Sequence, residues 1–207
     1  MKFLLAAIAA MKSMLVPLAP TDKKFTDVEK QFSTQTKGGI ANAKVLFMAA
    51  IVPCKQMVQK YDQYKVSLGA AANEKRLWHG TKCPCNFANT RTLCTNVNCA
   101  LCSIIQSGLQ LKFAAKGSWG AGLYHGTSPV KSHGYNSGSQ AAGPNGENLR
   151  VMLLNRVIVG TTASTVPPSG AITAPPAGHH SVTGGGTEVI VYREDATIPS
   201  YVIVYSF

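Results

Sequence analysis

The stretch of sequence that decides the fold reads GAGLYHGTSPVKSHGY and spans Gly120–Tyr135. Two more segments carry side chains of the same kinds: LWHGT over Leu77–Thr81 and TEVIVY over Thr187–Tyr192. Together they offer aromatic faces, hydroxyls, an imidazole and a carboxylate, the groups that hold a flat ring, an amide and a sugar. No segment identifies a site by itself. Their order along the chain is the signal, and we predict that the fold gathers them around one ligand.

In this order the three segments resemble the His, Tyr and Glu segments of the poly(ADP-ribose) polymerase catalytic domain. The resemblance covers roughly residues 25–207 and is most specific from Leu77 onward. The C-terminal part, which includes APPAGHHSVTG over residues 174–184, is similar to the tankyrase branch of that family. The resemblance implies an ADP-ribosyltransferase fold, with two packed, mainly antiparallel β-sheets and a few helices around an NAD cleft.

The resemblance also implies roles for the residues of the first and third segments. His79 would bind the ribose on the adenosine side of NAD, and the backbone of Gly80 would pair with the nicotinamide amide. Thr81 stands where the family has a Ser or Thr hydroxyl. Glu188 matches the carboxylate that binds the 2′-hydroxyl of the nicotinamide ribose and stabilises the developing positive charge.

The second segment would hold the nicotinamide. By the same resemblance, Tyr124 and Tyr135 sandwich the ring, and the hydroxyl of Ser132 holds its amide. Two positions depart from the family pattern, on the side where the acceptor is handled. The usual Lys between the two glycines is Ala121, and the usual aromatic residue after the first Tyr is His125.

The implied activity is that of an NAD-dependent ADP-ribosyltransferase, with His79, Tyr124 and Glu188 as its catalytic residues. It would cleave the bond between nicotinamide and ribose and transfer ADP-ribose, as single units or as a polymer, to protein acceptors including itself. Two alternatives remain open. One is a non-catalytic module that binds NAD or ADP-ribose, and the other is a secreted, toxin-like mono-ADP-ribosyltransferase.

A cysteine cluster follows the first segment, because five of the six cysteines lie between Cys83 and Cys102. Four thiolates that include a Cys-x-x-Cys pair are typical of a structural zinc site. We predict that the ligands are Cys85, Cys94, Cys99 and Cys102, in an insertion over residues 83–102. Fungal relatives that the insertion resembles carry a Cys six residues after the His, which favours Cys85 over Cys83 as the first ligand. The alternative is a disulfide cluster in a secreted protein.

Secondary-structure signals predict a mixed α+β domain. The eight-residue apolar run Val45–Val52 favours a buried strand over a helix. Beyond it Met57, Tyr61 and Tyr64 recur at helical spacing, and Pro53 is suited to the first turn of that helix. Short β-branched or aromatic runs predict further strands at Val151–Val159, Glu188–Tyr192 and Tyr201–Phe207. Two connections rich in Gly, Pro, Ser and Thr are predicted as exposed loops, Gly134–Gly146 and Thr161–Gly178.

The composition and net charge indicate the size of the domain and the classes of partner. With 207 residues, 45% of them hydrophobic and 14% charged, the chain fits one packed domain, expected as a monomer. Its 20 Lys and Arg exceed its 9 Asp and Glu, and the net charge of +11 favours polyanionic partners: nucleic acid, an anionic membrane surface or the phosphates of NAD. No nucleic-acid-binding motif supports the first of these.

The N-terminus has two interpretations, a cleaved signal peptide or an amphipathic helix, within an N-terminal segment over residues 1–24. Lys2 precedes a short apolar run typical of a secretory signal, and Lys12 interrupts it. The run is too short to span a membrane. The thiolate cluster favours an intracellular location, whereas the signal-like start keeps secretion open. Residues 25–207 would form the catalytic domain, and too little chain precedes Phe25 for a helical regulatory domain over the pocket.

Overall fold

The computed structural model describes residues 12–136 and 141–207. The strands are β1 (Met14–Pro17), β2 (Lys44–Val52), β3 (Glu74–His79), β4 (Leu123–Gly126), β5 (Ala141–Ala142), β6 (Asn148–Ile158), β7 (Thr162–Ala163), β8 (Ser181–Gly184), β9 (Glu188–Val191) and β10 (Thr197–Ser206). The α-helices are α2 (Lys23–Thr36), α3 (Lys55–Leu68), α4 (Phe87–Thr90), α5 (Ala100–Ser107) and α6 (Pro129–Tyr135). Short 3-10 turns are η1 (Gly69–Ala72), η2 (Leu111–Phe113) and η4 (Glu194–Ala196).

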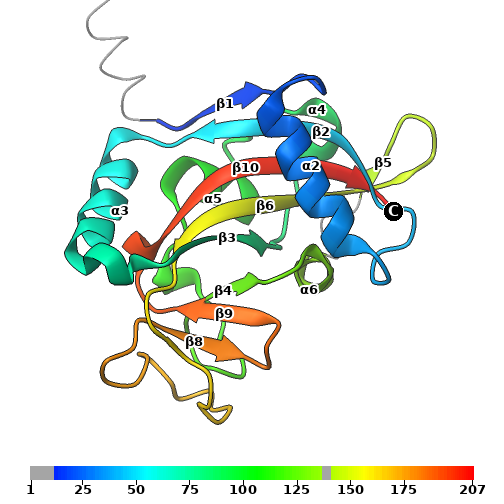
Figure 1. The fold of residues 1–207 in the computed structure, drawn as a ribbon. Coiled ribbons are helices and arrows are strands. Elements are labelled where there is room, and N and C mark those ends of the chain that lie inside the picture. The colour runs from blue at the N-terminus through cyan, green and yellow to red at the C-terminus, as the bar shows by residue number, and fades with distance from the viewer. Residues whose placement is uncertain (1–11, 137–140) are drawn as a thin grey trace, which may run out of the picture.

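The strands join in the order β1-β2-β10-β6-β3-β4-β9-β8-β7, with β5 paired to β6 (Figure 1). The ladders along this path are antiparallel except that of β7 with β8. The predicted α+β fold with mainly antiparallel strands is therefore confirmed. Its two predicted sheets are two halves of one path, linked by the single pair Trp78 and Gly126 between β3 and β4.

Helix α2 covers one face of the larger half. It begins after Asp22, whose carboxylate accepts a hydrogen bond from Lys24 N at 2.7 Å and so caps the first turn. Phe25, Val28 and Phe32 recur at helical spacing and are buried. They pack into one core cluster with the side chains that this sheet face presents, Met48, Trp78, Met152, Leu154 and Ile203.

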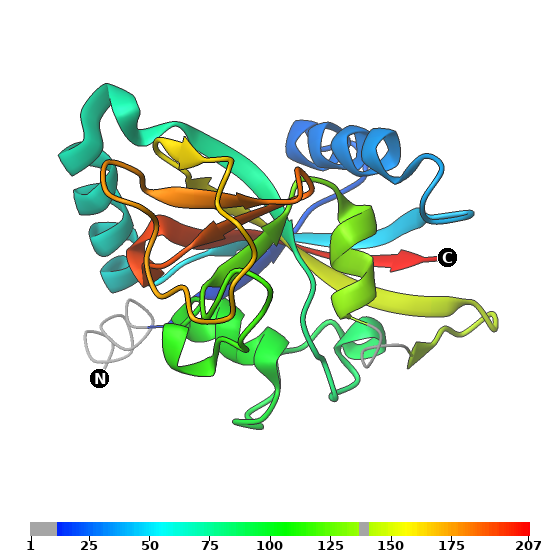
Figure 2. The ribbon, with the colours of Figure 1, turned by 90° about the horizontal axis from the view of Figure 1, so that it is seen from below.

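Helix α5 lies on the opposite face of the sheet (Figure 2). Its Leu101, Cys102 and Ile105 are buried in a second cluster with residues of β2, β6 and β10. The predicted helix beyond Pro53 is confirmed as α3, whose Tyr61 and Tyr64 are buried. Pro53 itself precedes the helix, because Cys54 is the N-cap, so its predicted place in the first turn is wrong.

Both predicted loops contain regular structure. Gly134 and Tyr135 form the last turn of α6 instead of opening a loop, because this short helix is held by tertiary contacts. Within Thr161–Gly178, the predicted loop contains β7, which pairs with β8.

At the N-terminus, Met14–Pro17 pairs with β2, while the signal-like residues 1–11 lie outside the described part. Among the described residues, no helix has the length and apolar character needed to cross a membrane.

Candidate active site

The three sequence segments meet around one pocket of about 860 Å³. Every residue that the sequence predicts for the site lines it: His79, Gly80, Thr81, Tyr124, Ser132, Tyr135 and Glu188. Strand β4 explains this convergence, because it pairs with β3 at Trp78 and with β9 at Glu188, both through Gly126. The ends of three strands that are distant in sequence are thereby brought to one place.

Two glycines let α6 approach these strand ends. A Cβ on Gly80 would overlap the backbone carbonyl oxygen of Ser132, and a Cβ on Gly126 would lie 2.7 Å from its hydroxyl oxygen. Real Cβ atoms do not come this close to other heavy atoms, so any larger residue would displace the helix. The contact leaves Ser132 buried at the pocket wall.

His79 presents a hydrogen-bond acceptor. Its Nδ1 lies 2.9 Å from the backbone oxygen of Tyr124, and a carbonyl only accepts, so Nδ1 carries the proton. Burial lowers the pKa of His79, although the bond to Tyr124 opposes this, and the ring is therefore neutral at pH 7. The lone pair then resides on Nε2, where a sugar hydroxyl can donate to it.

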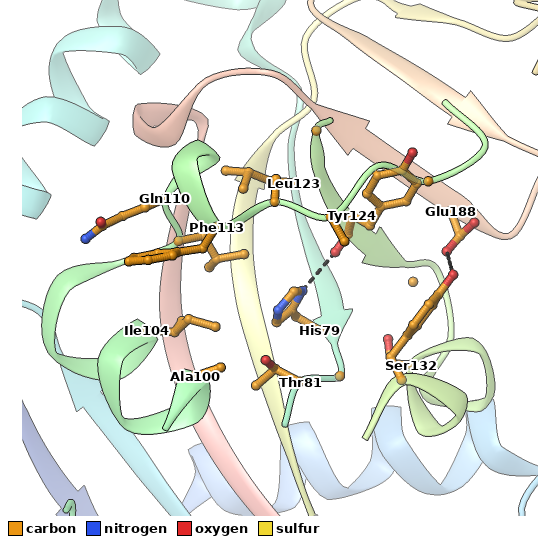
Figure 3. A pocket seen from close by; sticks show the side chains of 18 of the residues that line it. His79, Thr81, Ala100, Ile104, Gln110, Phe113, Leu123, Tyr124, Ser132 and Glu188 are labelled. Atoms are coloured by element: carbon orange, nitrogen blue, oxygen red, sulfur yellow. Dashed lines mark hydrogen bonds between the residues drawn. The ribbon is translucent and has the colours of Figure 1, made fainter. Parts of the chain in front are cut away.

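The ring of Tyr124 is fixed at its phenol end. The hydroxyl donates to Gly120 O at 2.9 Å and accepts from Trp119 N at 2.9 Å. Burial raises the pKa of Tyr124, so the hydroxyl stays protonated and keeps both bonds. The tyrosine thus offers the pocket a ring in a set orientation, and its polar end is already used (Figure 3).

Glu188 is the only acidic residue among the described residues that line the pocket. Glu188 is 4% exposed. One of its carboxylate oxygens accepts a hydrogen bond from Tyr135 Oη at 3.0 Å, drawn as a dashed line in Figure 3. The other oxygen lies 3.6 Å from Lys131 Nζ. Burial, and then the bond to Glu188, raise the pKa of Tyr135 to about 12, so Tyr135 remains the donor.

The opposite wall was not predicted. Ala100 and Ile104 of α5, with Gln110 and Phe113, lie on the other side of His79 from Ser132 and Glu188 (Figure 3). One end of the pocket is therefore mainly apolar, and the other carries the carboxylate of Glu188 and the hydroxyl of Ser132. No motif marks this wall in the sequence. The one signal is Phe113, an aromatic side chain in a segment rich in Lys, Ala and Gly, which is 73% exposed.

His125, one of the departures from the family pattern, does not face the pocket. Successive side chains of a strand point to opposite faces, so His125 points away from the side of Tyr124. It is fully buried, with Nε2 3.0 Å from Thr197 Oγ1 and Nδ1 3.1 Å from Leu123 O. Its position is therefore part of the core and not of an acceptor site.

The four predicted metal ligands are brought together. The sulfur atoms of Cys85, Cys94, Cys99 and Cys102 lie within 4.8 Å of one another. Cys85 Sγ is 3.6 Å from Cys99 Sγ and 3.8 Å from Cys102 Sγ. Thiolates around a tetrahedral zinc ion, with Zn–S near 2.3 Å, are separated by about 3.8 Å. The set fits zinc, and no pair approaches the roughly 2.05 Å of a disulfide.

Cys83 lies beside this set. Its sulfur is 3.7 Å from Cys85 Sγ, and the residue is buried. The backbone N–H of Leu101 donates to Lys82 O at 3.2 Å, so the loop after Thr81 and the start of α5 are also joined through the main chain. The thiol cluster consequently connects two segments that both line the pocket.

The family model of the poly(ADP-ribose) polymerase catalytic domain matches residues 22–206. The matched range includes every segment of the pocket and all four clustered cysteines.

Proposed function

Because the chain belongs to the poly(ADP-ribose) polymerase catalytic domain family, we propose that it cleaves NAD in this pocket and transfers ADP-ribose to protein acceptors, including itself. The family uses NAD as its co-substrate, and ADP-ribosyl transfer is its general activity. One observation carries the assignment to this chain. A neutral imidazole, two tyrosine rings, a buried hydroxyl and a buried carboxylate all line the same pocket.

The two ends of the pocket would take the two ends of NAD. The nicotinamide ring would lie between Tyr124 and Tyr135, with its amide bonded to Ser132 and to the backbone of Gly80. The adenosine would occupy the apolar end, and its ribose would donate a hydrogen bond to His79 Nε2. The fixed ring of Tyr124 supports placing the nicotinamide at this end. The tyrosine side chain is already held in one orientation, so it loses little conformational entropy when the nicotinamide stacks on it.

Glu188 would stabilise the reacting sugar. The bond between the ribose C1′ and the nicotinamide nitrogen breaks, and its electron pair goes to the pyridine ring and cancels the positive charge there. The ribose becomes cation-like, as in glycoside hydrolysis, and the carboxylate accepts a hydrogen bond from the 2′-hydroxyl. The acceptor nucleophile then bonds to C1′ and loses its proton to water. A carboxylate has acceptor sites for both the 2′-hydroxyl and Tyr135.

Labelled NAD tests this proposal. We expect wild-type protein to release nicotinamide and to become labelled. Asp27→Asn, on the exposed side of α2, removes an acid that does not line the pocket and should label as well as wild type. Nicotinamide-labelled and adenine-labelled NAD separate cleavage from binding. Wild-type protein that binds NAD without releasing nicotinamide would reject the transferase and support a non-catalytic NAD-binding module.

We also propose that the chain is of the tankyrase-like branch with a fungal-type insertion, and that Cys85, Cys94, Cys99 and Cys102 hold a structural zinc ion. Four thiolates leave no open coordination position, so the ion would supply no catalytic chemistry. It would hold the loop after Thr81 against α5. We assign residues 25–207 to a monomeric catalytic domain, with the insertion at residues 83–102.

A further inference from the structure

Helix α6 supplies the nicotinamide end of the pocket but is too short to be stable by itself. It has seven residues, including Gly134, whereas isolated helices shorter than roughly 12–15 residues are marginal in water. Lys131, Ser132 and Tyr135 line the pocket. Tertiary contacts must therefore fix the helix, and some of them are made by residues that do not line the pocket.

A hydrogen-bond network anchors the end of α6 to the sheet. Asn136, the fully buried C-cap residue, donates from Nδ2 to Val151 O at 2.9 Å and to Tyr205 Oη at 3.1 Å. His133 Nδ1 lies 2.8 Å from the same Tyr205 oxygen. The hydroxyl of Tyr205, a buried residue of β10, thus contacts two residues at the end of the helix.

Arg150 of β6 completes the network and fixes the proton on His133. Its Nη1 lies 2.7 Å from His133 Nε2 and 3.0 Å from His133 O. A guanidinium only donates, so Nε2 must hold the lone pair and Nδ1 must carry the hydrogen that is donated to Tyr205. Burial, and then the adjacent Arg150, lower the pKa of His133, which agrees with a neutral ring.

Arg150 acts on the helix end in two more ways. The last carbonyls of a helix lack partners within it, and Arg150 donates to one of them. A cation at a helix C-terminus also favours the helix electrostatically. The Phe207 ring holds the guanidinium, with its centroid 4.5 Å from Arg150 Cζ, and packs edge-on against the His133 ring at 4.8 Å.

We propose that His133 and Arg150, acting through Tyr205 and Asn136, are positioning residues that set the orientation of α6 and thereby the placement of Ser132 and Tyr135 around nicotinamide. The inference rests on the proposed function, since it concerns the nicotinamide end of the same pocket. None of the four residues lines the pocket among the described residues. Their effect would therefore reach the ligand only through the helix.

This arrangement predicts that disrupting the network affects the binding of nicotinamide and of ADP-ribose differently. ADP-ribose lacks nicotinamide, and its adenosine would lie at the end formed by α5 and Phe113. Disrupting the network should therefore weaken nicotinamide binding and NAD turnover while leaving ADP-ribose binding unchanged. A structural defect would reduce the binding of both ligands together.

The test measures the Kd values of nicotinamide and ADP-ribose by calorimetry, and kcat and KM for NAD. His133→Leu removes the donor and the acceptor of the ring. We expect nicotinamide to bind about tenfold more weakly, which corresponds to about one lost hydrogen bond, and ADP-ribose to bind within about twofold of wild type. Tyr205→Phe removes only the shared hydroxyl and is the second variant if His133→Leu does not fold. His179→Gln, at a histidine away from this pocket, is the control and should change neither Kd.

The double variant His133→Leu with Tyr205→Phe should lose little more than either single variant, because both act on one network. Unchanged nicotinamide binding in the single variants, or equal losses for both ligands, would overturn the inference and leave the proposed function intact. Wild-type protein that binds neither ligand would overturn the proposed function and this inference with it.

Discussion

At the residue scale, Gly80 and Gly134 are a matched pair with opposite predicted effects. A Cβ on Gly80 would overlap the carbonyl oxygen of Ser132, whereas a Cβ on Gly134 would meet nothing within 4 Å. We expect Gly80→Ala to displace α6 and to lower kcat/KM for NAD strongly, since a misplacement of about 1 Å costs on the order of 100-fold. Gly134→Ala should keep activity and stabilise the protein by about 0.5–1 kcal/mol. Similar kinetics in the two variants would contradict the close approach of α6 to β3.

His125 predicts how stability depends on pH. Burial lowers its pKa to about 3, whereas the ordinary value is 6.5. Between these two values the unfolded chain binds more protons than the folded one, so the free energy of unfolding decreases as pH falls. The decrease attributable to His125 is at most about 5 kcal/mol, at about 1.4 kcal/mol for each pH unit.

Urea unfolding between pH 7 and pH 3.5 measures this effect. His125→Gln has no ring to protonate and should show a smaller loss of stability over that range. His179→Gln, at a half-buried histidine outside the core, is the control and should retain the wild-type slope. Parallel curves for wild type and His125→Gln would show that His125 does not titrate in this way.

At the scale of elements, α5 joins the thiol cluster to the pocket wall. Cys99 is its N-cap and Cys102 lies in its first turn, while Ala100 and Ile104 line the pocket. We expect purified protein to contain about one zinc ion per chain. Chelation should lower the Tm by roughly 5–10 °C, since each kcal/mol corresponds to about 2–4 °C in a chain of this size, and should weaken NAD binding.

Cysteine variants separate the metal site from thiol loss in general. Cys102→Ser should reproduce the effects of chelation, whereas Cys54→Ser, at a cysteine outside the cluster, should keep zinc, Tm and NAD affinity. Protein made without chelator that carries no zinc and has oxidised thiols would support the disulfide alternative.

Some helices and strands could be predicted from the sequence, and others could not. Strand β2 and helix α3 followed from apolar runs and helical spacing, because each buries a continuous face. The end of α6 was wrongly predicted as a loop, since Gly134 disfavours a helix and tertiary contacts of His133, Tyr135 and Asn136 stabilise one there. The place of α5 in the pocket wall could not be predicted, because its lining residues Ala100, Ser103 and Ile104 form no ligand-binding motif.

At the scale of the whole molecule, the residues that line the site could be predicted better than the strand pairing that brings them together. The residues predicted for the site all line the pocket, because the resemblance supplied their order along the chain. The pairing of β4 with both β3 and β9 depends on long-range register, which local sequence does not encode. Assigning β4 as a strand would also have shown that Tyr124 and His125 face opposite ways.

We expect Glu188 to stabilise the cleavage of NAD and to contribute little to NAD binding. The most direct measurement compares nicotinamide release at saturating NAD with the Kd of NAD in wild type and Glu188→Gln. We expect the release rate to fall by on the order of 100-fold to 1000-fold, the loss typical of one electrostatic stabiliser, while the Kd stays within about threefold, less than 1 kcal/mol. An unchanged release rate in Glu188→Gln, with NAD bound equally well, would show that Glu188 does not stabilise the cleavage.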